Sequence, residues 1–143
     1  MAADDLARAD PLPRVITWLG AHPLMVAELG GVDRVGLVNK PPYPRIRITD
    51  PPGDDRDLRW LLAPVVQIEA YGDLDGSPGK AQLRWLLYLA LGVLKELPEQ
   101  ETPAAGPVIT EVESLLGGSW QPEPNGQPRY LAQVRVYCHP VPA

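Results

Sequence analysis

Cysteine is almost absent from this chain of 143 residues, which contains only Cys138. One cysteine excludes an internal disulfide and is typical of a protein from a reducing compartment. Cys138 follows Val134 and Val136 at alternate positions, where the residues of a strand share one face. We therefore expect Cys138 to be a small core residue, and not a metal ligand or a reactive thiol.

Residues that carry catalysis are also scarce. Both histidines, His22 and His139, lack a cysteine or acid at metal-ligand spacing, and serine occurs only three times. Three glutamates fall on the same predicted sheet face as three arginines, which favours ion pairing over a catalytic carboxylate pair. A Ser–His–Asp set could still assemble in space, because its members need not be close in sequence. We predict a protein that is not an enzyme, with no metal and no cofactor.

Basic excess and long apolar runs are missing as well. Acidic residues outnumber basic ones 18 to 13, giving a net charge of −5, and no basic stripe is visible, which argues against direct binding of nucleic acid. The longest apolar stretch, Trp85 to Leu94, has ten residues, against about 20 in a membrane-spanning helix. The N-terminal residues lack the basic and apolar regions of a signal peptide, so we expect a soluble protein that is not secreted by that route.

Proline is abundant, at 18 residues, and clusters between short periodic segments, which indicates stiff connections. Alternating apolar residues predict strands over residues 45–49, 63–72, 108–114 and 129–137, and more weakly over 32–38. Helical spacing predicts a short helix from Pro11 to Gly20, a further turn over 24–29, and a main helix from Ser77 to Leu97. In the main helix, Ser77 is the expected N-cap and Pro78 the first helical residue.

The main helix has a buried stripe that the sequence defines well: Leu83, Leu86, Leu87, Ala90, Leu94 and Leu97. Trp85, Tyr88 and Leu91 widen this stripe, so the helix is apolar around much of its circumference. Deep packing against the sheet and the first helix explains this width. A contact between subunits is the alternative explanation.

These patterns together predict an α+β fold in one domain, residues 1–143, with residues 1–10 expected to fray. The sheet is predicted to be mixed or antiparallel, with about four to five strands and two helices packed on one face. The other face would then display polar and aromatic side chains: Arg45, Arg47, Gln67, Glu69, Tyr71, Ile109, Glu111, Glu113, Leu131, Gln133, Arg135 and Tyr137. Such a face can simply contact water. It can also be a recognition surface, since tyrosine and arginine are enriched at interfaces.

Two sets of residues are the candidates for binding sites. Six residues of the polar sheet face are the predicted subunit interface: Arg47, Glu69, Tyr71, Glu111, Arg135 and Tyr137. The acidic loop from Asp50 to Asp57 is a candidate for partner docking, because it is polar and rich in turn-forming residues. Its charged members are Asp50, Asp54, Asp55, Arg56 and Asp57. A solvated turn without a role is the alternative for this loop.

The order of these segments resembles a known family. A short N-terminal helix precedes Pro-Arg-Ile-Arg-Ile, and a strand ending in Glu-Ala-Tyr-Gly-Asp precedes a helix ending in Leu-Pro. Val-Ile-Thr-Glu-Val-Glu-Ser, Gly-Gly-Ser-Trp-Gln-Pro-Glu-Pro and Arg-Tyr-Leu-Ala-Gln-Val-Arg-Val follow. This layout, over residues 11–138, resembles the tail terminator proteins, also called tail completion or head-tail joining proteins, of long-tailed bacteriophages. The proline-rich segments at 41–44 and 122–124 depart from the family pattern.

The resemblance implies a structural virion protein at the junction of tail and neck, assembled in the host cytoplasm. Such proteins form a hexameric ring that caps the tail tube, stops its polymerisation and joins the tail to the head connector, with DNA passing through the centre. The expected partners are further copies of the chain, the tail tube protein and a connector or neck protein, with no membrane. Another phage neck protein, such as a head-closure or adaptor protein, and a small cellular α+β binding domain are the alternatives.

Overall fold

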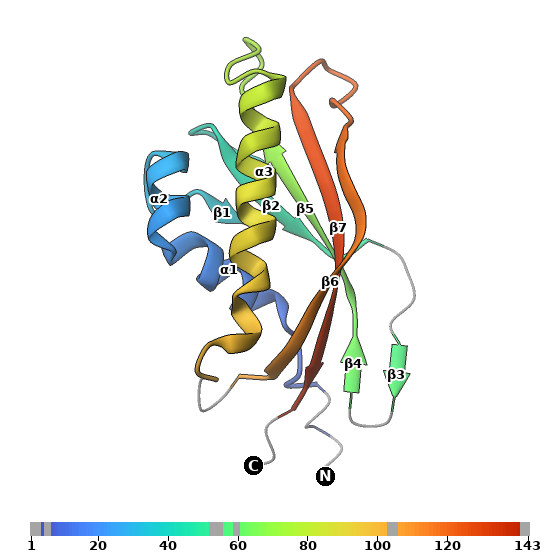
Figure 1. Ribbon diagram of the computed structural model, residues 1–143. Coiled ribbons are helices and arrows are strands. Elements are labelled where there is room, and N and C mark those ends of the chain that lie inside the picture. The colour runs from blue at the N-terminus through green and yellow to red at the C-terminus, as the bar shows by residue number, and fades with distance from the viewer. Residues whose placement is uncertain (1–3, 5–6, 52–55, 59–60, 103–105, 141–143) are drawn as a thin grey trace.

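The computed structural model describes residues 4, 7–51, 56–58, 61–102 and 106–140. Within these ranges the fold is α+β, as predicted, with three α-helices packed on one face of a mixed sheet (Figure 1). The helices are α1 (Leu12–Ala21), α2 (Pro23–Leu29) and α3 (Lys80–Lys95), and a short 3-10 turn, η2 (Leu97–Glu99), follows α3. The strands are β1 (Val35–Gly36), β2 (Arg45–Thr49), β3 (Arg56–Leu58), β4 (Leu61–Ala63), β5 (Val65–Tyr71), β6 (Val108–Trp120) and β7 (Arg129–His139).

The sheet has seven strands in the described residues, against the four to five predicted. β1 has only two residues and lies within the weakly predicted strand at 32–38, whereas β3, with three residues, was not predicted. A further strand arises because β4 and β5 are one extended segment interrupted at Pro64, which has no amide hydrogen for the ladder. The carbonyl of Pro64 still accepts a hydrogen bond from the amide of Val136 at 3.0 Å, so β7 pairs with both halves. β1 runs parallel to β2, and the other neighbouring strands are antiparallel.

The core lies between α3 and the sheet, as the helical stripe predicted. Leu86, Leu87, Ala90 and Leu94 are at most 3% exposed and belong to one cluster with Val66, Ile68, Val134 and Val136. β2 and β6 flank the central strands β5 and β7, and α1 and α2 pack beside α3 and β1. The prediction of helices on one face and of a buried leucine stripe is confirmed, although α2 makes three helices in the described residues where two were predicted.

The start of α3 differs from the prediction. The helix begins at Lys80, with Gly79 in extended conformation as its N-cap, so Ser77 and Pro78 precede the helix. The reason is a turn that holds Ser77: its amide donates to Asp75 Oδ1 at 2.9 Å and its carbonyl accepts from the amide of Asp73 at 2.9 Å. The Ser77 carbonyl is thus directed toward Asp73, and the carbonyl of Gly79 accepts the first helical hydrogen bond, from the amide of Leu83 at 3.0 Å.

Ile109 also lies on the face opposite to the predicted one. It pairs with Cys138 on the core side of the sheet and is 2% exposed. The register shifts between Ile109 and Glu111, which leaves Thr110 as an extra residue in β6. A bulge of this kind reverses the alternation of side chains on one side of it. Strict alternation placed Ile109 on the polar face for that reason, whereas Val112 points into the core as expected.

Candidate assembly surfaces

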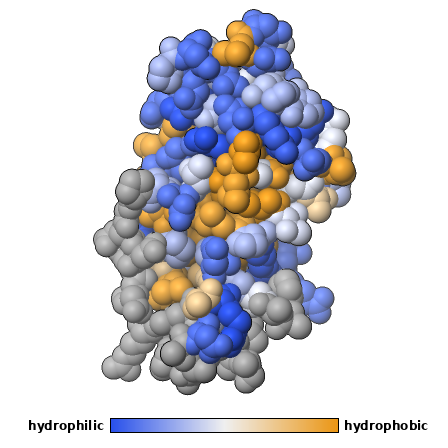
Figure 2. Space-filling model, turned by 180° about the vertical axis from the view of Figure 1, so that it is seen from behind, coloured by the Kyte–Doolittle hydropathy of each residue, from blue (hydrophilic) through white to orange (hydrophobic). Residues whose placement is uncertain are grey.

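The face of the sheet that carries no helix gathers most of the side chains predicted for it. Arg45, Tyr71 and Arg129 align across three neighbouring strands, and Arg47, Glu69 and Leu131 form the next row. Figure 2 shows the molecule from behind, with hydrophilic groups over its upper part and an apolar patch at its centre. The strand register assigns Val65, Leu116 and Leu131 to this side of the sheet.

Glu69 is the centre of a buried polar network on this face. Its carboxylate is 1% exposed and accepts four hydrogen bonds. Oε2 accepts from Arg47 Nε at 2.9 Å and from the Tyr71 hydroxyl at 2.7 Å, and Oε1 accepts from Arg47 Nη2 at 3.3 Å and from Gln67 Nε2 at 2.7 Å. A buried carboxylate is tolerated only when its acceptor sites are filled in this way. The network therefore joins β2 to β5 through side chains as well as through the ladder.

The electrostatics of this network favour the charged form of Glu69. Burial alone raises its pKa, but hydrogen bonds from Tyr71, Arg47 and Gln67 outweigh burial, so the net pKa lies below the ordinary value. Burial, followed by the hydrogen bonds to Glu69 and Glu123, raises the pKa of Tyr71. Tyr71 accordingly remains a neutral hydroxyl.

The connection between β6 and β7 closes over one end of the network. Glu123, from that connection, contacts the Tyr71 hydroxyl at 2.7 Å and Arg129 Nη1 at 2.8 Å. The same connection is held in place by Gln127, whose side-chain Nε2 donates a hydrogen bond to the backbone carbonyl of Gly72 at 2.9 Å. Tyr71 is consequently 0% exposed. Sequence reasoning expected Glu69 and Tyr71 to be displayed on the open face, and that expectation is wrong because this loop packs onto them.

The other predicted interface residues fall into two groups. Arg135 is 6% exposed and donates from Nη1 to the carbonyl of Ala63 at 2.7 Å, so it is held within the subunit. Arg47 and Tyr137 are partly exposed, and Glu111 is exposed. Of the six residues predicted for the subunit interface, only these three are therefore accessible to a second molecule in this conformation.

The acidic loop is shorter than predicted. Asp50 is exposed and follows β2 directly. Arg56 and Asp57, expected in the loop, belong to the backbone of β3, which pairs with β4 in the register Arg56–Ala63 and Asp57–Leu62. Asp54 and Asp55 lie outside the described residues. The role of the loop in docking stays a prediction.

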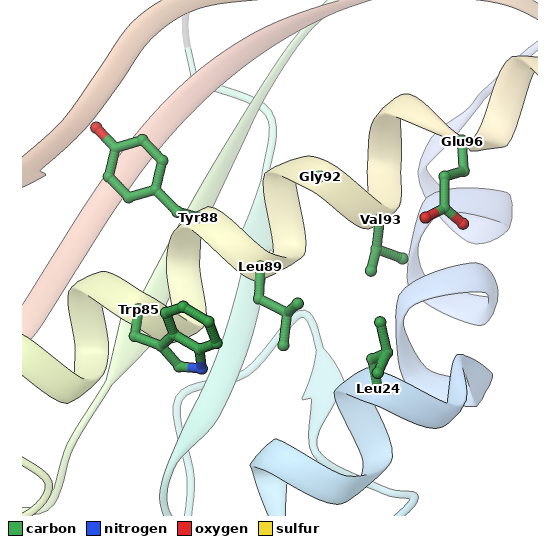
Figure 3. Close-up of a pocket in the computed structure, with 7 residues that line it drawn as sticks. All are labelled: Leu24, Trp85, Tyr88, Leu89, Gly92, Val93 and Glu96. Atoms are coloured by element: carbon green, nitrogen blue, oxygen red, sulfur yellow. The ribbon is translucent and has the colours of Figure 1, made fainter.

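An apolar cleft between α2 and α3 was not singled out by sequence reasoning. Its volume is about 350 Å³, and it is lined by Leu24, Trp85, Tyr88, Leu89, Gly92, Val93 and Glu96 (Figure 3). Leu24 is 52% exposed and Trp85 59% exposed, which is unusual for large apolar side chains placed close together. The available signal was the apolar width of α3, for which a subunit contact was the alternative explanation.

The cleft has a basic and an aromatic side chain at one end and an acidic side chain at the other. Arg84 lies over the Tyr88 ring, with its guanidinium carbon 4.5 Å from the ring centroid. The Tyr88 hydroxyl in turn accepts a hydrogen bond from the amide of Gly118 in β6 at 3.0 Å. Glu96 closes the far end of the cleft and contacts His22 at 3.4 Å. These contacts fix the aromatic side of the cleft.

A second exposed apolar site lies on β6. Leu115 and Leu116 are adjacent in sequence and are 42% and 40% exposed. The register of β6 against β7 shifts on both sides of Leu116, so the strand does not alternate here. Irregularities of this kind at a sheet edge also hinder extension of the ladder by another strand. What β6 offers a partner is therefore a pair of leucine side chains.

Residues that bind metal ions do not cluster in the described part of the chain. Within residues 7–51, 56–58, 61–102 and 106–140 there is no cluster of three or more His, Cys, Asp and Glu residues suited to a metal ion. Cys138 is buried in the core cluster, as predicted, and its Sγ donates to the carbonyl of Ala9 at 3.4 Å. No helix among the described residues has the length and apolar character needed to cross a membrane.

Comparison with known proteins gives no family: no family model matches the chain, and no curated protein matches it.

Proposed function

We propose that this chain is a structural virion protein of the tail terminator kind, which assembles into a ring on the end of a phage tail tube. The observation that carries the proposal is that large apolar side chains are exposed on more than one surface of one small domain, and two of these surfaces lie on different elements. One is the α2–α3 cleft, and the other is the Leu115–Leu116 pair on β6. Two unlike surfaces on one subunit allow each copy to contact two neighbours, which is the requirement for a ring.

The segments that carry the family resemblance support the proposal through their order. Pro-Arg-Ile-Arg-Ile contains the first four residues of β2, and Glu-Ala-Tyr ends β5. Val-Ile-Thr-Glu-Val-Glu-Ser opens β6, and Arg-Tyr-Leu-Ala-Gln-Val-Arg-Val opens β7. The similarity in sequence order therefore falls on the elements that build the sheet.

The charge of the chain fits a conduit for DNA. Each copy carries a formal net charge of −5, and a ring of six copies would carry six times that charge. A strongly negative ring repels the phosphate backbone, so DNA would pass through without being bound. The tail tube protein and a head connector or neck protein are the proposed partners, and the tail–neck junction is the proposed location.

A small cellular binding domain is the second candidate, and the α2–α3 cleft is the observation that favours it. Pockets for small ligands usually have volumes of about 300–1,000 Å³ and apolar linings, and this cleft lies in the lower part of that range. A domain of this kind would remain a monomer of 15.6 kDa when its cleft is filled. Another neck protein is also compatible with the fold.

Electron microscopy of the purified protein separates these candidates. The terminator proposal predicts closed rings with a central opening. It also predicts that tails made without the protein exceed their normal length and fail to join heads, and that adding the purified protein restores joining. Isolated 15.6 kDa particles at every protein concentration, with no effect on tails, would reject it.

A further inference from the structure

We infer that the α2–α3 cleft of one copy receives the Leu115–Leu116 pair of β6 from the next copy. This inference rests on the proposed ring and names the two surfaces that would form its contacts. The occupant of the cleft is thus a second copy of this chain. Two alternatives are a contact between the α3 helices of two copies and a cleft that binds a different molecule. The variants described below distinguish these alternatives from the proposed pairing.

Charge complementarity is the first argument for this pairing. α3 contains Lys80, Arg84 and Lys95 and no acidic residue, although the chain as a whole is acidic. β6 contains Glu111 and Glu113 and no basic residue. All five side chains are exposed. Arg84 lies over Tyr88 at one part of the cleft, whereas Glu96 at the far end contacts His22. An acidic strand such as β6 would therefore meet the cleft on its Arg84 side, where opposite charges favour encounter in the correct orientation.

Shape is the second argument. The cleft is concave and open, with Leu24 and Trp85 exposed at opposite sides of it (Figure 3). Leu115 and Leu116 are two neighbouring, exposed side chains on a strand that lacks regular alternation. Covering Trp85 and the leucines together would remove the largest exposed apolar groups of both surfaces from water.

The position of the two surfaces is the third argument. The helices α2 and α3, which line the cleft, lie on one side of the sheet (Figure 1), whereas Leu116 pairs with Gln133 and faces the opposite side. A contact between opposite sides joins each copy to a different surface of its neighbour. Contacts of this head-to-tail type close into rings when the rotation between neighbours allows it.

A contact of α3 with α3 is less favourable on the same evidence. It would bring the Arg84 side chains of two copies onto one helix–helix surface, with no acidic residue within α3 to offset them. Glu96, just beyond α3, already contacts His22. Such a contact would also leave Leu115 and Leu116 exposed to water.

Two variants, each defective in one surface, test the pairing. Trp85→Glu places a carboxylate in the cleft, and Leu116→Glu places one on β6, where entry into an apolar cleft is penalised. Both positions are 40% exposed or more, so the subunit should remain folded, which circular dichroism checks. Leu74→Glu is the matched control, because Leu74 is 63% exposed and lies in neither surface.

Each variant alone should associate at least about tenfold more weakly than the unmodified chain, as expected for loss of a large apolar interface residue. The decisive sample is an equal mixture of Trp85→Glu and Leu116→Glu, measured by sedimentation velocity. The mixture contains one intact cleft and one intact β6, so it should form dimers of twice 15.6 kDa and no rings. Leu74→Glu should assemble like the unmodified chain.

Each other result has a defined meaning. If Leu116→Glu assembles normally while Trp85→Glu does not, α3 contacts something other than β6, and the pairing is wrong. If both variants assemble normally, the ring survives but its contacts lie elsewhere. If the unmodified chain is a monomer at every concentration, the proposed ring itself is wrong, and the pairing is rejected with it.

Discussion

Replacing Glu69 by glutamine tests the buried network that joins β2 to β5. The two residues have the same shape, but glutamine presents one oxygen and one NH₂ group where Glu69 presents two oxygens. Each Glu69 oxygen accepts one hydrogen bond from Arg47 and one from a second donor. In either orientation the NH₂ group would therefore face an Arg47 donor, and Arg47 cannot become an acceptor.

The size of the effect follows from these bonds. A hydrogen bond to a charged group contributes about 1.5–3 kcal/mol, and the Arg47 side chain, at 30% exposed, can partly turn to water instead. We expect Glu69→Gln to lower the free energy of unfolding by about 2–4 kcal/mol, the sum of one to two such bonds after this compensation. Urea denaturation at neutral pH measures it. Glu113→Gln is the matched control, an exposed carboxylate on the same face, which should change stability by less than about 0.5 kcal/mol.

The pH dependence gives the same test a second readout. Because the pKa of Glu69 is lower in the folded chain, folding favours the carboxylate. This stability is complete above the unfolded pKa of about 4.3 and is lost as the pH falls through the lower folded value. The difference in unfolding free energy between the unmodified chain and Glu69→Gln should therefore shrink below about pH 4. A difference under about 0.5 kcal/mol at neutral pH, or one that does not change on acidification, would refute the network as described.

Three further predictions concern the packing. Leu87→Ala should cost about 2–5 kcal/mol in chemical denaturation, since Leu87 is 0% exposed in the core, and a cost below about 0.5 kcal/mol would mean that the face of α3 is misassigned. Gly118→Ala should lower the free energy of unfolding by about 1–3 kcal/mol, because the new Cβ would lie 2.7 Å from Tyr88 Cε2. Gly117→Ala is the control and should cost less, because its Cβ would lie 3.6 Å from the nearest atom. Equal costs for the two variants would contradict the contact between Gly118 and Tyr88. Gly92→Ala should stabilise α3 by about 0.5–1 kcal/mol, because a Cβ there meets no atom within 4 Å, and a loss of stability would contradict that open space.

Local patterns predicted the parts of the fold that depend on local forces. The stripe from Leu83 to Leu94 lies on one side of α3 because helical spacing alone decides which residues share a face, and the predicted last member, Leu97, is buried in η2. Alternation placed β2 correctly at Arg45–Thr49 for the equivalent reason in a strand. The class of fold and the side of the sheet covered by helices follow from these two periodicities.

The parts that were missed depend on contacts between distant residues. The bulge at Thr110 arises in the pairing of β6 with β7, and it turned Ile109 into the core against its apparent alternation. The burial of Glu69 and Tyr71 requires Glu123, more than fifty residues away in the chain, and periodicity within one strand holds no information about it. The α2–α3 cleft likewise depends on how two helices pack. The sequence indicated it only through the apolar residues of α3 outside the buried stripe, such as Trp85 and Tyr88.

The proposed role of the acidic loop remains open to a direct test. Deleting Pro52 to Asp55 should leave stable subunits that no longer join tails to heads if the loop docks a partner. If tails still join heads at the normal level, the loop does not dock a partner, and the proposal of a ring is unaffected.

The mass of the unmodified chain across a range of concentrations tests the central claim most directly. Sedimentation velocity combined with electron microscopy should show a closed ring, with a mass that is a multiple of 15.6 kDa and six copies as the number implied by the resemblance. A chain that remains at 15.6 kDa at every concentration, or that stops at a dimer, would contradict the proposal that this protein is a ring-forming tail component.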